Sequence, residues 1–262
     1  MKQGFVIPVY RHAKTACLIA PQLAAMGLPV ILVDDGNTKE EQMILEEFAS
    51  NFAAGNLAAS SAQNMPGITL IRLDKNSGKG KAVIKGFQKA DELELTHVLQ
   101  IDADGQHDIK RVKFFLEESE KNPDKIICGF PEFDSSAPRH RLIGRKISTF
   151  WAVIVTLSTE LKDLLCGFRV YPVKASLKAS RNIFFDNRMG FDTEILIRLY
   201  WKNVLPVFHP IKVIYPQDGI SNFNMVRDNI RISWMFTRLF FGMLLRLPVL
   251  IPRKIIRSIK GE

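Results

Sequence analysis

The sequence has few cysteines, and their positions form no recognisable pattern. Its 262 residues contain only Cys17, Cys128 and Cys166, which lie far apart and include no CxxC pair. This argues against a disulfide framework and against a cysteine-rich zinc site, and it predicts a reducing, cytosol-facing location. The opening segment GFVIPVY is too short for the apolar region of a signal peptide and lacks a small-residue cleavage site, so nothing predicts export.

Two common nucleotide-binding patterns and a membrane-spanning run are also missing. The chain contains neither a GxxxxGK[ST] phosphate loop nor a strand-GxGxxG-helix segment, which disfavours ATP hydrolysis and dinucleotide binding. The longest apolar region, from Trp234 onward, is interrupted by Arg238, Arg246 and two prolines. The pattern therefore does not predict a helix that spans a membrane.

Charge is distributed unevenly along the chain. Residues 1–130 carry 15 Lys and Arg against 17 Asp and Glu, whereas residues 131–262 carry 21 against 10. An anionic partner is thus expected to meet the second half. A basic nucleic-acid-binding protein is one reading, but the cations accompany long aliphatic runs and no nucleic-acid motif occurs, so we expect no nucleic-acid partner.

Short β-rich apolar runs alternate with amphipathic stretches in the first half. Strands are predicted at 4–10, 29–35, 68–74, 97–104 and 125–130. Helices are predicted at 12–26, 38–54, 79–91 and 108–121. Strands that are apolar at nearly every position are buried on both faces, so the pattern predicts a mainly parallel sheet flanked by helices. The polar residues at the carboxyl ends of the first four strands should share one cleft.

The pattern changes after residue 130, where we place the end of the first unit. Residues 131–146, PEFDSSAPRHRLIGRK, read as a loop of turn residues and cations. Beyond it we expect a strand within 166–172, a helix over 190–202 and a pair of strands within 205–216. The chain has enough apolar residues, at 47%, for one full core or two modest ones.

The segment DADGQH follows a predicted buried strand and concentrates negative charge. Asp102 and Asp104 repel each other unless a cation or a proton lies between them. Mg²⁺ or Mn²⁺ takes oxygen ligands and retains substrate phosphate oxygens, so these carboxylates and the Gln106 amide oxygen suit a metal diphosphate. The alternative is a polar turn in which Asp108 caps the next helix.

Six segments in order resemble the family 2 glycosyltransferases, in particular the branch of dolichyl-phosphate mannose and glucose synthases. The segments are IPVY at 7–10, VDDG at 33–36, NSGKGKAVIKGF at 76–87, DADGQH at 102–107, DLLCGFR at 163–169 and GFDTEILIR at 190–198. The resemblance implies a GT-A glycosyltransferase fold, a Rossmann-like α/β unit, and metal-dependent transfer of a sugar. It divides the chain into a catalytic domain over 1–218, with a nucleotide-sugar-binding part over 1–130 and an acceptor-side part over 131–218, and a tail over 219–262.

The resemblance also implies roles on the donor side. Pro8 and Tyr10 would lie beside the base or ribose of a UDP- or GDP-sugar, and Asp35 would bond to the base edge. The alternative is that Tyr10 packs in the core and that Asp34 or Asp35 caps a helix. Lys79 is our candidate for the donor diphosphate, because it starts a predicted helix after Gly78.

The same comparison assigns the metal and diphosphate to Asp102, Asp104 and Gln106, with Asp104 as the surest ligand. His107 either closes the metal site or is a surface residue at a helix start, and we leave it out of the site. Arg169 is expected to bind either the diphosphate or Asp163 as an ion pair.

Two acceptors are consistent with the sequence. A polyprenyl phosphate is already ionised near neutral pH and needs cations rather than a base; these are expected from Arg139, Arg141, Arg145 and Lys146. A hydroxyl acceptor needs a general base, for which Asp192 is the candidate and Glu194 the reserve. The alternative is that both residues fix the loop or bind sugar hydroxyls. The expected catalytic residues are therefore Asp104, Asp192 and Arg145. A sugar nucleotidyltransferase is a third reading, although the first strand lacks a glycine- and arginine-rich triphosphate loop.

The C-terminal tail mixes bulky apolar side chains with regularly placed cations. Residues 219–262 carry eight Lys and Arg against two acids. This composition predicts an amphipathic segment in the headgroup region of an anionic membrane, on the cytoplasmic face. The alternative is a helix packed on the chain's own core or in an oligomer interface. By resemblance, Asp218 and Ser221 line the acceptor side. The resulting prediction is an inverting, metal-dependent transfer from a nucleotide sugar to a lipid-linked acceptor.

Overall fold

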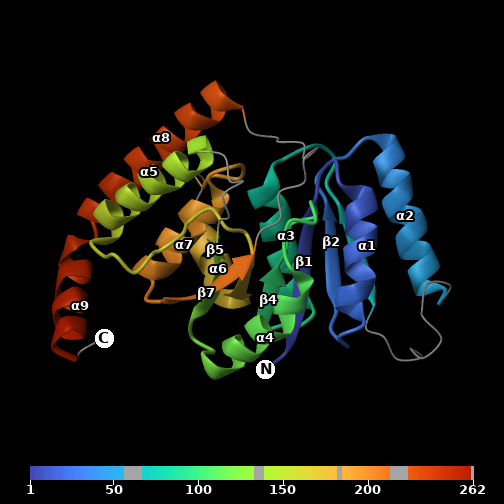
Figure 1. The fold of residues 1–262 in the computed structure, drawn as a ribbon, viewed down its shortest axis with the longest axis horizontal. Helices are drawn as coiled ribbons and strands as arrows, with labels where there is room; N and C mark the ends of the chain where they lie inside the picture. The colour runs from blue at the N-terminus through green and yellow to red at the C-terminus, as the bar shows by residue number, and fades with distance from the viewer. Residues whose placement is uncertain (56–66, 133–138, 182–184, 213–223, 261–262) are drawn as a thin grey trace.

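A single seven-stranded sheet organises the molecule (Figure 1). The computed structural model describes residues 1–55, 67–132, 139–181, 185–212 and 224–260. Within them the strands run in the order β3-β2-β1-β4-β6-β5-β7. Their bounds are β1 Gln3–Val9, β2 Val30–Asp34, β3 Ile68–Arg72, β4 His97–Gln100, β5 Ile126–Glu132, β6 Arg169–Pro172 and β7 Pro206–Lys212.

Strand direction follows from the connections. β1, β2, β3 and β4 are joined through helices, and each neighbouring pair among them is parallel. β6 lies antiparallel between β4 and β5, and β5 pairs parallel with β7. Every residue of β1, β2 and β4 is buried, as expected for strands covered on both faces. The predicted mainly parallel α/β sheet is confirmed.

Helices cover both faces of the sheet. One apolar core joins the sheet to the first, second and fourth helices, and the other joins it to the third and the fifth to ninth. The helix bounds are α1 Ala13–Ala24, α2 Lys39–Ala53, α3 Lys79–Glu92, α4 Val112–Lys121, α5 Arg139–Thr156, α6 Val173–Ser180, α7 Phe191–Trp201, α8 Met225–Leu244 and α9 Leu247–Lys260. Thr38 caps α2, and Asp108 caps the short 3-10 turn before α4, as one reading of DADGQHD expected.

The structure corrects the prediction for residues 131–146. We expected a loop there, but α5 begins at Arg139, so Arg145 and Lys146 lie on a helix. The reason is tertiary: α5 packs against α8, where Trp151 stacks on Phe236 with ring centroids 6.1 Å apart. The strand pair expected within 205–216 is represented by β7 alone, and residues 213–216 lie outside the described part.

The C-terminal segment forms two helices, α8 and α9, along the side of the molecule formed by α5 and α7 (Figure 1). Met235, Phe236, Leu239 and Met243 of α8 are buried in the core, so packing on the chain's own core is correct for one face of this helix. No helix within the described residues is long and apolar enough to span a membrane.

Candidate active site

The carboxyl ends of the central parallel strands meet at one edge of the sheet. The carboxylate of Asp35, just past β2, accepts hydrogen bonds from the backbone N–H groups of Ser77 at 2.7 Å and Gly78 at 2.9 Å. It thereby fixes the loop that leads into α3. Asp34 is buried beside it and pairs with Arg72 at 3.0 Å. Neither aspartate caps a helix, because Thr38 caps α2 and α3 has no side-chain cap. The contact of Asp35 with the base remains a prediction.

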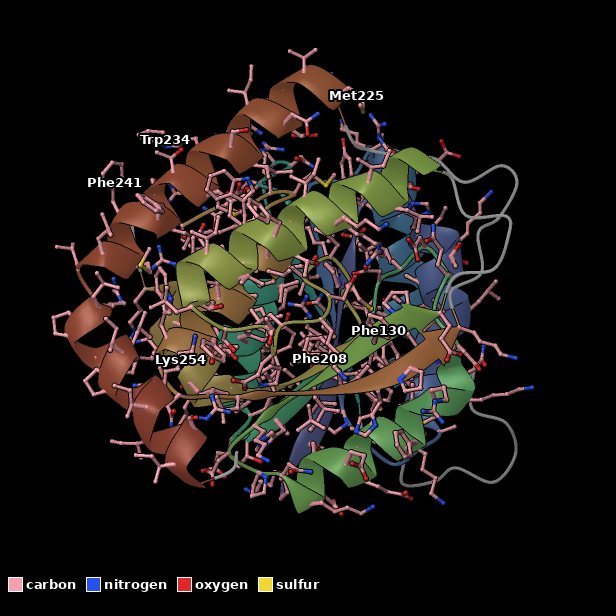
Figure 2. The ribbon with its side chains drawn as sticks, turned by 60° about the vertical axis from the view of Figure 1, so that its left-hand side comes forward. Phe130, Phe208, Met225, Trp234, Phe241 and Lys254 are labelled. Carbon is pink, nitrogen blue, oxygen red and sulfur yellow. The ribbon has the colours of Figure 1, made fainter. Side chains whose placement is uncertain are left out.

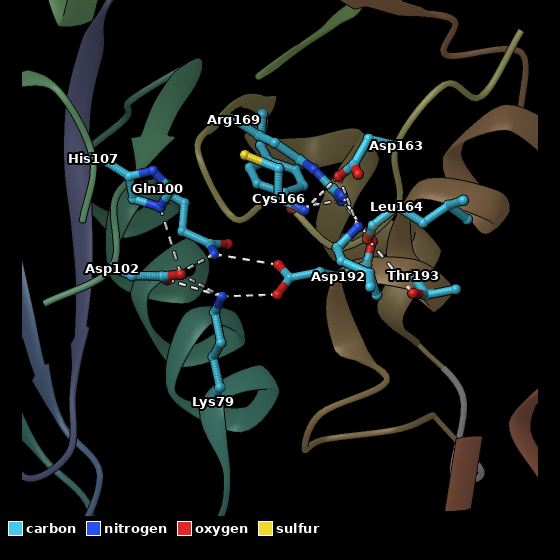
Figure 3. Close-up of polar contacts among 12 residues, drawn as sticks. Lys79, Gln100, Asp102, His107, Asp163, Leu164, Cys166, Arg169, Asp192 and Thr193 are labelled. Carbon is cyan, nitrogen blue, oxygen red and sulfur yellow. Dashed lines mark hydrogen bonds and ion pairs between the residues drawn. The ribbon is translucent and has the colours of Figure 1, made fainter. Parts of the chain in front are cut away.

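Three charged side chains from separate elements converge at this edge (Figure 3). Lys79, the first residue of α3, places its Nζ 2.8 Å from an oxygen of Asp102, which follows β4. The same Nζ lies 2.8 Å from Oδ2 of Asp192, in the first turn of α7. The sequence assigned these residues to donor, metal and base roles separately, and the structure brings them into one cluster.

Glycine at two positions permits this approach. Gly78, immediately before Lys79, has φ of +97°, a conformation that side-chain-bearing residues rarely adopt. A Cβ at Gly167 would come within 2.6 Å of Lys79 Nζ and 2.7 Å of Asp102 Oδ2. The backbone at Gly167 therefore borders the cluster, and any larger residue at this position would displace the Lys79 and Asp102 side chains.

The charges in the cluster shift one another's protonation. Burial raises the pKa of Asp102, but the adjacent Lys79 ammonium and His107 outweigh it, and the net pKa lies well below its usual range. Burial lowers the pKa of Lys79, but Asp102 and Asp192 together hold it above its usual value. Asp104 behaves oppositely, because burial and the Asp102 charge raise its pKa. Asp102 and Lys79 are thus held as an ion pair, whereas Asp104 lacks equal compensation.

Two members of the site were missed by sequence reasoning. Gln100 is fully buried on β4, and its Nε2 lies 3.3 Å from Asp192 Oδ1 and 3.5 Å from Asp102 Oδ1. Its position two residues before Asp102, on the same face of the strand, was the available signal. Of the two alternatives for His107, the surface position is not observed, because its side chain is 8% exposed and its Nε2 lies 3.7 Å from Asp102. The residue packs against the ring of Phe168.

Residues of the DLLCGFR segment hold the neighbouring loop and the first turn of α7 in place. Asp163 accepts from the backbone N–H groups of Leu165 and Cys166 and forms an ion pair with Arg145 of α5. Of the two alternatives for Arg169, the ion pair with Asp163 is not formed, and the diphosphate role stays a prediction. Arg169 is fully buried, and it donates to the carbonyl oxygen of Leu164 at 2.8 Å and to that of Asp192 at 2.5 Å. It thus holds the first turn of α7 in place.

Glu194, the reserve base, is engaged elsewhere. Its side chain is fully buried and binds Arg198 of α7 at 2.6 Å and Arg238 of α8 at 3.3 Å. It also accepts from the backbone N–H of Asp186 at 2.9 Å. A carboxylate with these partners is a structural link between α7 and α8, and it is not placed to act as a base.

The remaining predicted residues lie around this centre. Pro8 is buried on β1, and Tyr10 is half-buried with the Arg11 guanidinium 5.2 Å from its ring centroid. Lys146 is exposed on α5. Arg139 and Arg141 belong to the first turn of α5, but their side chains lie outside the described part, as do Asp218 and Ser221.

The chemistry of DADGQH fits a hard divalent ion. Among the described residues no group of three or more His, Cys, Asp and Glu is arranged around a metal position. Mg²⁺ and Mn²⁺, however, need only one or two protein carboxylates when substrate phosphates supply other ligands. Asp102 and Asp104 provide those. Burial, and after it the Asp102 charge, raises the pKa of Asp104, and a bound cation would offset both effects. Gln106 donates its backbone N–H to Asp104 Oδ1 at 3.0 Å, and the ligand role of its amide oxygen stays a prediction.

The fold and this site define a class of enzyme. The profile of the Glycosyl transferase family 2 matches residues 5–202. The chain belongs to glycosyl transferase family 2 and is a glycosyltransferase. The reading as a sugar nucleotidyltransferase is thereby set aside.

Three relatives at the sequence level are informative. Dolichyl-phosphate beta-glucosyltransferase of Dictyostelium discoideum is 26% identical over 221 residues, covering 79% of this chain and 63% of that protein. The chain therefore spans less than two thirds of that relative's length. UDP-N-acetylglucosamine--dolichyl-phosphate N-acetylglucosaminyltransferase of Methanococcus voltae is 24% identical over 245 residues, covering 92% and 96%. An uncharacterized protein of Methanocaldococcus jannaschii is 26% identical over 226 residues, covering 82% and 90%.

Solved structures confirm the predicted GT-A fold. Glucosyl-3-phosphoglycerate synthase from Mycobacterium tuberculosis in complex with uridine-diphosphate has a TM-score of 0.61 at 12% identity, covering 92% of this chain and 79% of that one. Its complex with Mn²⁺, UDP-Glc and phosphoglyceric acid has a TM-score of 0.58 at 14% identity, covering 93% and 78%.

Proposed function

We propose that the chain transfers a sugar from a UDP- or GDP-sugar to a polyprenyl phosphate, with inversion at the anomeric carbon and with Mg²⁺ or Mn²⁺. The observation that carries the proposal is the Lys79 bridge, because one ammonium binds both Asp102 and Asp192 at 2.8 Å. It joins a donor-side part, residues 1–130, to an acceptor-side part, residues 131–218. The relatives named above as acting on dolichyl phosphate support the choice of acceptor.

The reaction needs little proton transfer if the acceptor is a phosphate. An ionised phosphate oxygen attacks the anomeric carbon, a new carbon–oxygen bond forms, and the bond to the nucleoside diphosphate breaks. A divalent ion held by Asp102 and Asp104 would neutralise charge on that leaving group. In this scheme Lys79 binds the diphosphate of the donor, and Pro8, Tyr10 and Asp35 hold the nucleoside. Arg139, Arg141, Arg145 and Lys146 attract the acceptor phosphate to α5.

A hydroxyl acceptor would require Asp192 to take up a proton. The carboxylate of Asp192 is paired with Lys79 at 2.8 Å and receives the Gln100 amide at 3.3 Å. It would have to give up this ion pair before it could act as a base. A donor diphosphate bound to Lys79 would release Asp192 for that role, so the choice of a phosphate acceptor depends on the relatives named for dolichyl phosphate.

We place the enzyme on the cytoplasmic face of a membrane, held by the tail over 219–262. Several large apolar side chains of α8 are well exposed: Met225 at 62%, Trp234 at 62% and Phe241 at 60% (Figure 2). Apolar side chains of α5 and α9 are exposed as well, among them Phe150 at 63% and Ile259 at 80%. Exposed apolar side chains in a segment whose sequence, 219–262, carries eight Lys and Arg suit an anionic bilayer.

The test is product formation by the purified full chain. UDP- and GDP-sugars are offered in turn with dolichyl or undecaprenyl phosphate in detergent, with Mn²⁺, with Mg²⁺ and with a chelator. We expect a sugar-phosphate lipid in the organic phase, and we expect no such product when the chelator is present.

Asp104→Asn should lower the rate of transfer by about 100-fold or more. Asp108→Asn, which alters only a helix cap, is the matched control and should stay active. Full activity of Asp104→Asn would remove the metal assignment.

A further inference from the structure

A pocket separate from the active site lies where α9 meets the end of α7. Its volume is about 570 Å³, within the range of small-molecule sites. The lining comes from the end of α5, the following turn, Tyr200 of α7, and α9. Tyr200 is eight residues beyond Asp192 on the same helix, which corresponds to a separation of about 12 Å. The pocket therefore does not belong to the Lys79 cluster.

The lining of this pocket is cationic. Arg253, Lys254 and Arg257 face one acid, Glu160, and the other polar lining residues are Thr156, Ser158, Thr159, Tyr200 and Ser258. Arg253 donates to the carbonyl oxygen of Trp201 at 3.0 Å, at the C-terminal end of α7. Lys254 is exposed and makes no hydrogen bond or ion pair with the described residues. The pocket thus carries a surplus of positive charge.

One donor in the pocket is buried and unsatisfied. Arg257 binds Glu160 at 2.8 Å through one terminal nitrogen and the Tyr200 hydroxyl at 3.3 Å through the other. Its Nε is buried and has no hydrogen-bond partner within the described structure. Buried donors are rarely left without an acceptor, because the loss of hydration is not repaid. An anion with several oxygens, such as a phosphate group, would accept from the exposed Lys254 and, after a shift of the Arg257 side chain, from its guanidinium.

The rim of the pocket adjoins apolar surface on the same helix. Ile251 precedes Lys254 by three residues, and Ile255 precedes Ser258 by three, so each pair lies on neighbouring positions of the α9 surface. Ile251 is 47% exposed and Ile255 is 54% exposed. A ligand with its phosphate in the pocket would lay an attached hydrocarbon chain over these isoleucines. This juxtaposition of charge and apolar surface distinguishes a lipid phosphate from a soluble one.

We propose that this pocket binds the phosphate of an anionic membrane lipid, with Lys254 and Arg257 as the phosphate-binding residues. The proposal extends the membrane placement suggested above and rests on that part of the proposed function, but not on sugar transfer. It makes the attachment of α9 specific for a headgroup rather than a diffuse attraction. Lys254 is labelled in Figure 2.

The test measures binding of the full chain to vesicles of phosphatidylcholine alone and of phosphatidylcholine with phosphatidylglycerol. Lys254→Gln and Arg257→Gln are compared with Arg227→Gln, an exposed cation of α8 outside the pocket with the same change in charge. One surface cation contributes about fivefold to binding by simple attraction. We expect losses of about tenfold or more for the two pocket variants, and no more than about fivefold for Arg227→Gln.

Three outcomes would overturn the proposal. Equal losses for all three variants would mean diffuse attraction. Equal binding of the unmodified chain to both vesicles would mean apolar insertion only. The pocket would be a free-phosphate site if inorganic phosphate stabilised the chain against heat, if Lys254→Gln removed this effect, and if the vesicles showed no preference for phosphatidylglycerol.

Because Lys254 is exposed, Lys254→Gln should fold even if Arg257→Gln does not. Transfer in detergent should be unchanged in Lys254→Gln, so vesicle binding and sugar transfer succeed or fail separately.

Discussion

Lys79 and Asp192 are 113 positions apart in sequence, and the Lys79 Nζ lies 2.8 Å from Asp192 Oδ2. Lys79 begins α3 and Asp192 lies in the first turn of α7, so the contact joins two helices at the same edge of the sheet. Because Nζ also binds Asp102, a single cation neutralises carboxylates from both parts of the chain. Any anionic substrate that enters this edge will compete for that cation.

Replacing Lys79 should damage both stability and activity. Lys79→Met leaves Asp102 and Asp192 partly buried without their shared cation. We expect a loss of about 2 kcal/mol in the free energy of unfolding, less than for a fully buried pair because Lys79 is 25% exposed. Sugar transfer should fall by about 100-fold. Urea unfolding and the transfer assay measure the two effects.

Lys81→Met is the control for this variant. Lys81 lies two residues further along α3 and is exposed. Its replacement should change the unfolding free energy by less than about 0.5 kcal/mol and leave transfer intact. Equal behaviour of the two variants would show that the Lys79 bridge has no special role.

Gly167→Ala should disable the site without unfolding the protein. The new Cβ would lie 2.6 Å from Lys79 Nζ and 2.7 Å from Asp102 Oδ2, so these side chains must shift. A displacement of about 1 Å in such a cluster lowers rates by about 100-fold.

Gly144→Ala is the control for Gly167→Ala, because nothing lies within 4 Å of the Cβ position of Gly144 on α5. It should stabilise the chain by about 1 kcal/mol and leave activity unchanged.

Glu194→Gln separates a structural role from a basic one. The substitution leaves Arg198 and Arg238 without their buried carboxylate, and we expect a loss of about 3 kcal/mol. The specific activity of the folded protein should stay within about twofold of the unmodified chain. Glu160→Gln, whose carboxylate is 38% exposed, should cost less than about 1 kcal/mol. A rate loss in Glu194→Gln with unchanged stability would restore the base role.

Buried His97 should make the protein sensitive to mild acid. Burial lowers the pKa of His97, which bonds through Nε2 to the carbonyl oxygen of Pro123 at 2.9 Å. Between the folded and unfolded pKa values the unfolded chain binds more protons, so stability falls as the pH drops below about 6.5. His97→Gln should reduce the difference between unfolding free energies at pH 5.5 and pH 7.5. Part of it should remain, because burial also lowers the pKa of His209.

Much of the fold was predictable because a buried strand or helix face is apolar at positions that are close together in the sequence. Strands buried on both faces are apolar at nearly every position, as in VILVD of β2, and the helices between them showed amphipathic spacing. The start of α5 was missed because the segment PEFDSSAPRHRLIGRK is rich in turn residues and cations. Its helical state depends on packing against α8, about 90 positions away, which no local pattern contains.

The site was predictable as a set of residue types but not as a set of contacts. Asp102, Asp104, Lys79 and Asp192 were each named from motifs. The sequence offered Arg169 as a partner for Asp163, whereas the structure pairs Asp163 with Arg145 of α5, which had been named for another role. For Glu194 the sequence left a base role and a structural role open, and the structural contact depends on Arg238, which comes from the tail helix.

The sequence by itself determined the α/β class, the family motifs and the place of the acidic segment after a buried strand, since each depends on residues that are neighbours in the chain. The tertiary structure alone decided which charges meet. Lys79 reaches both Asp102 and Asp192, and Arg257 borders a cationic pocket, because ion pairs form between side chains brought together by packing of distant elements. Coulomb energy depends on the distance between the charges and on their burial, and the order of residues in the chain specifies neither quantity directly.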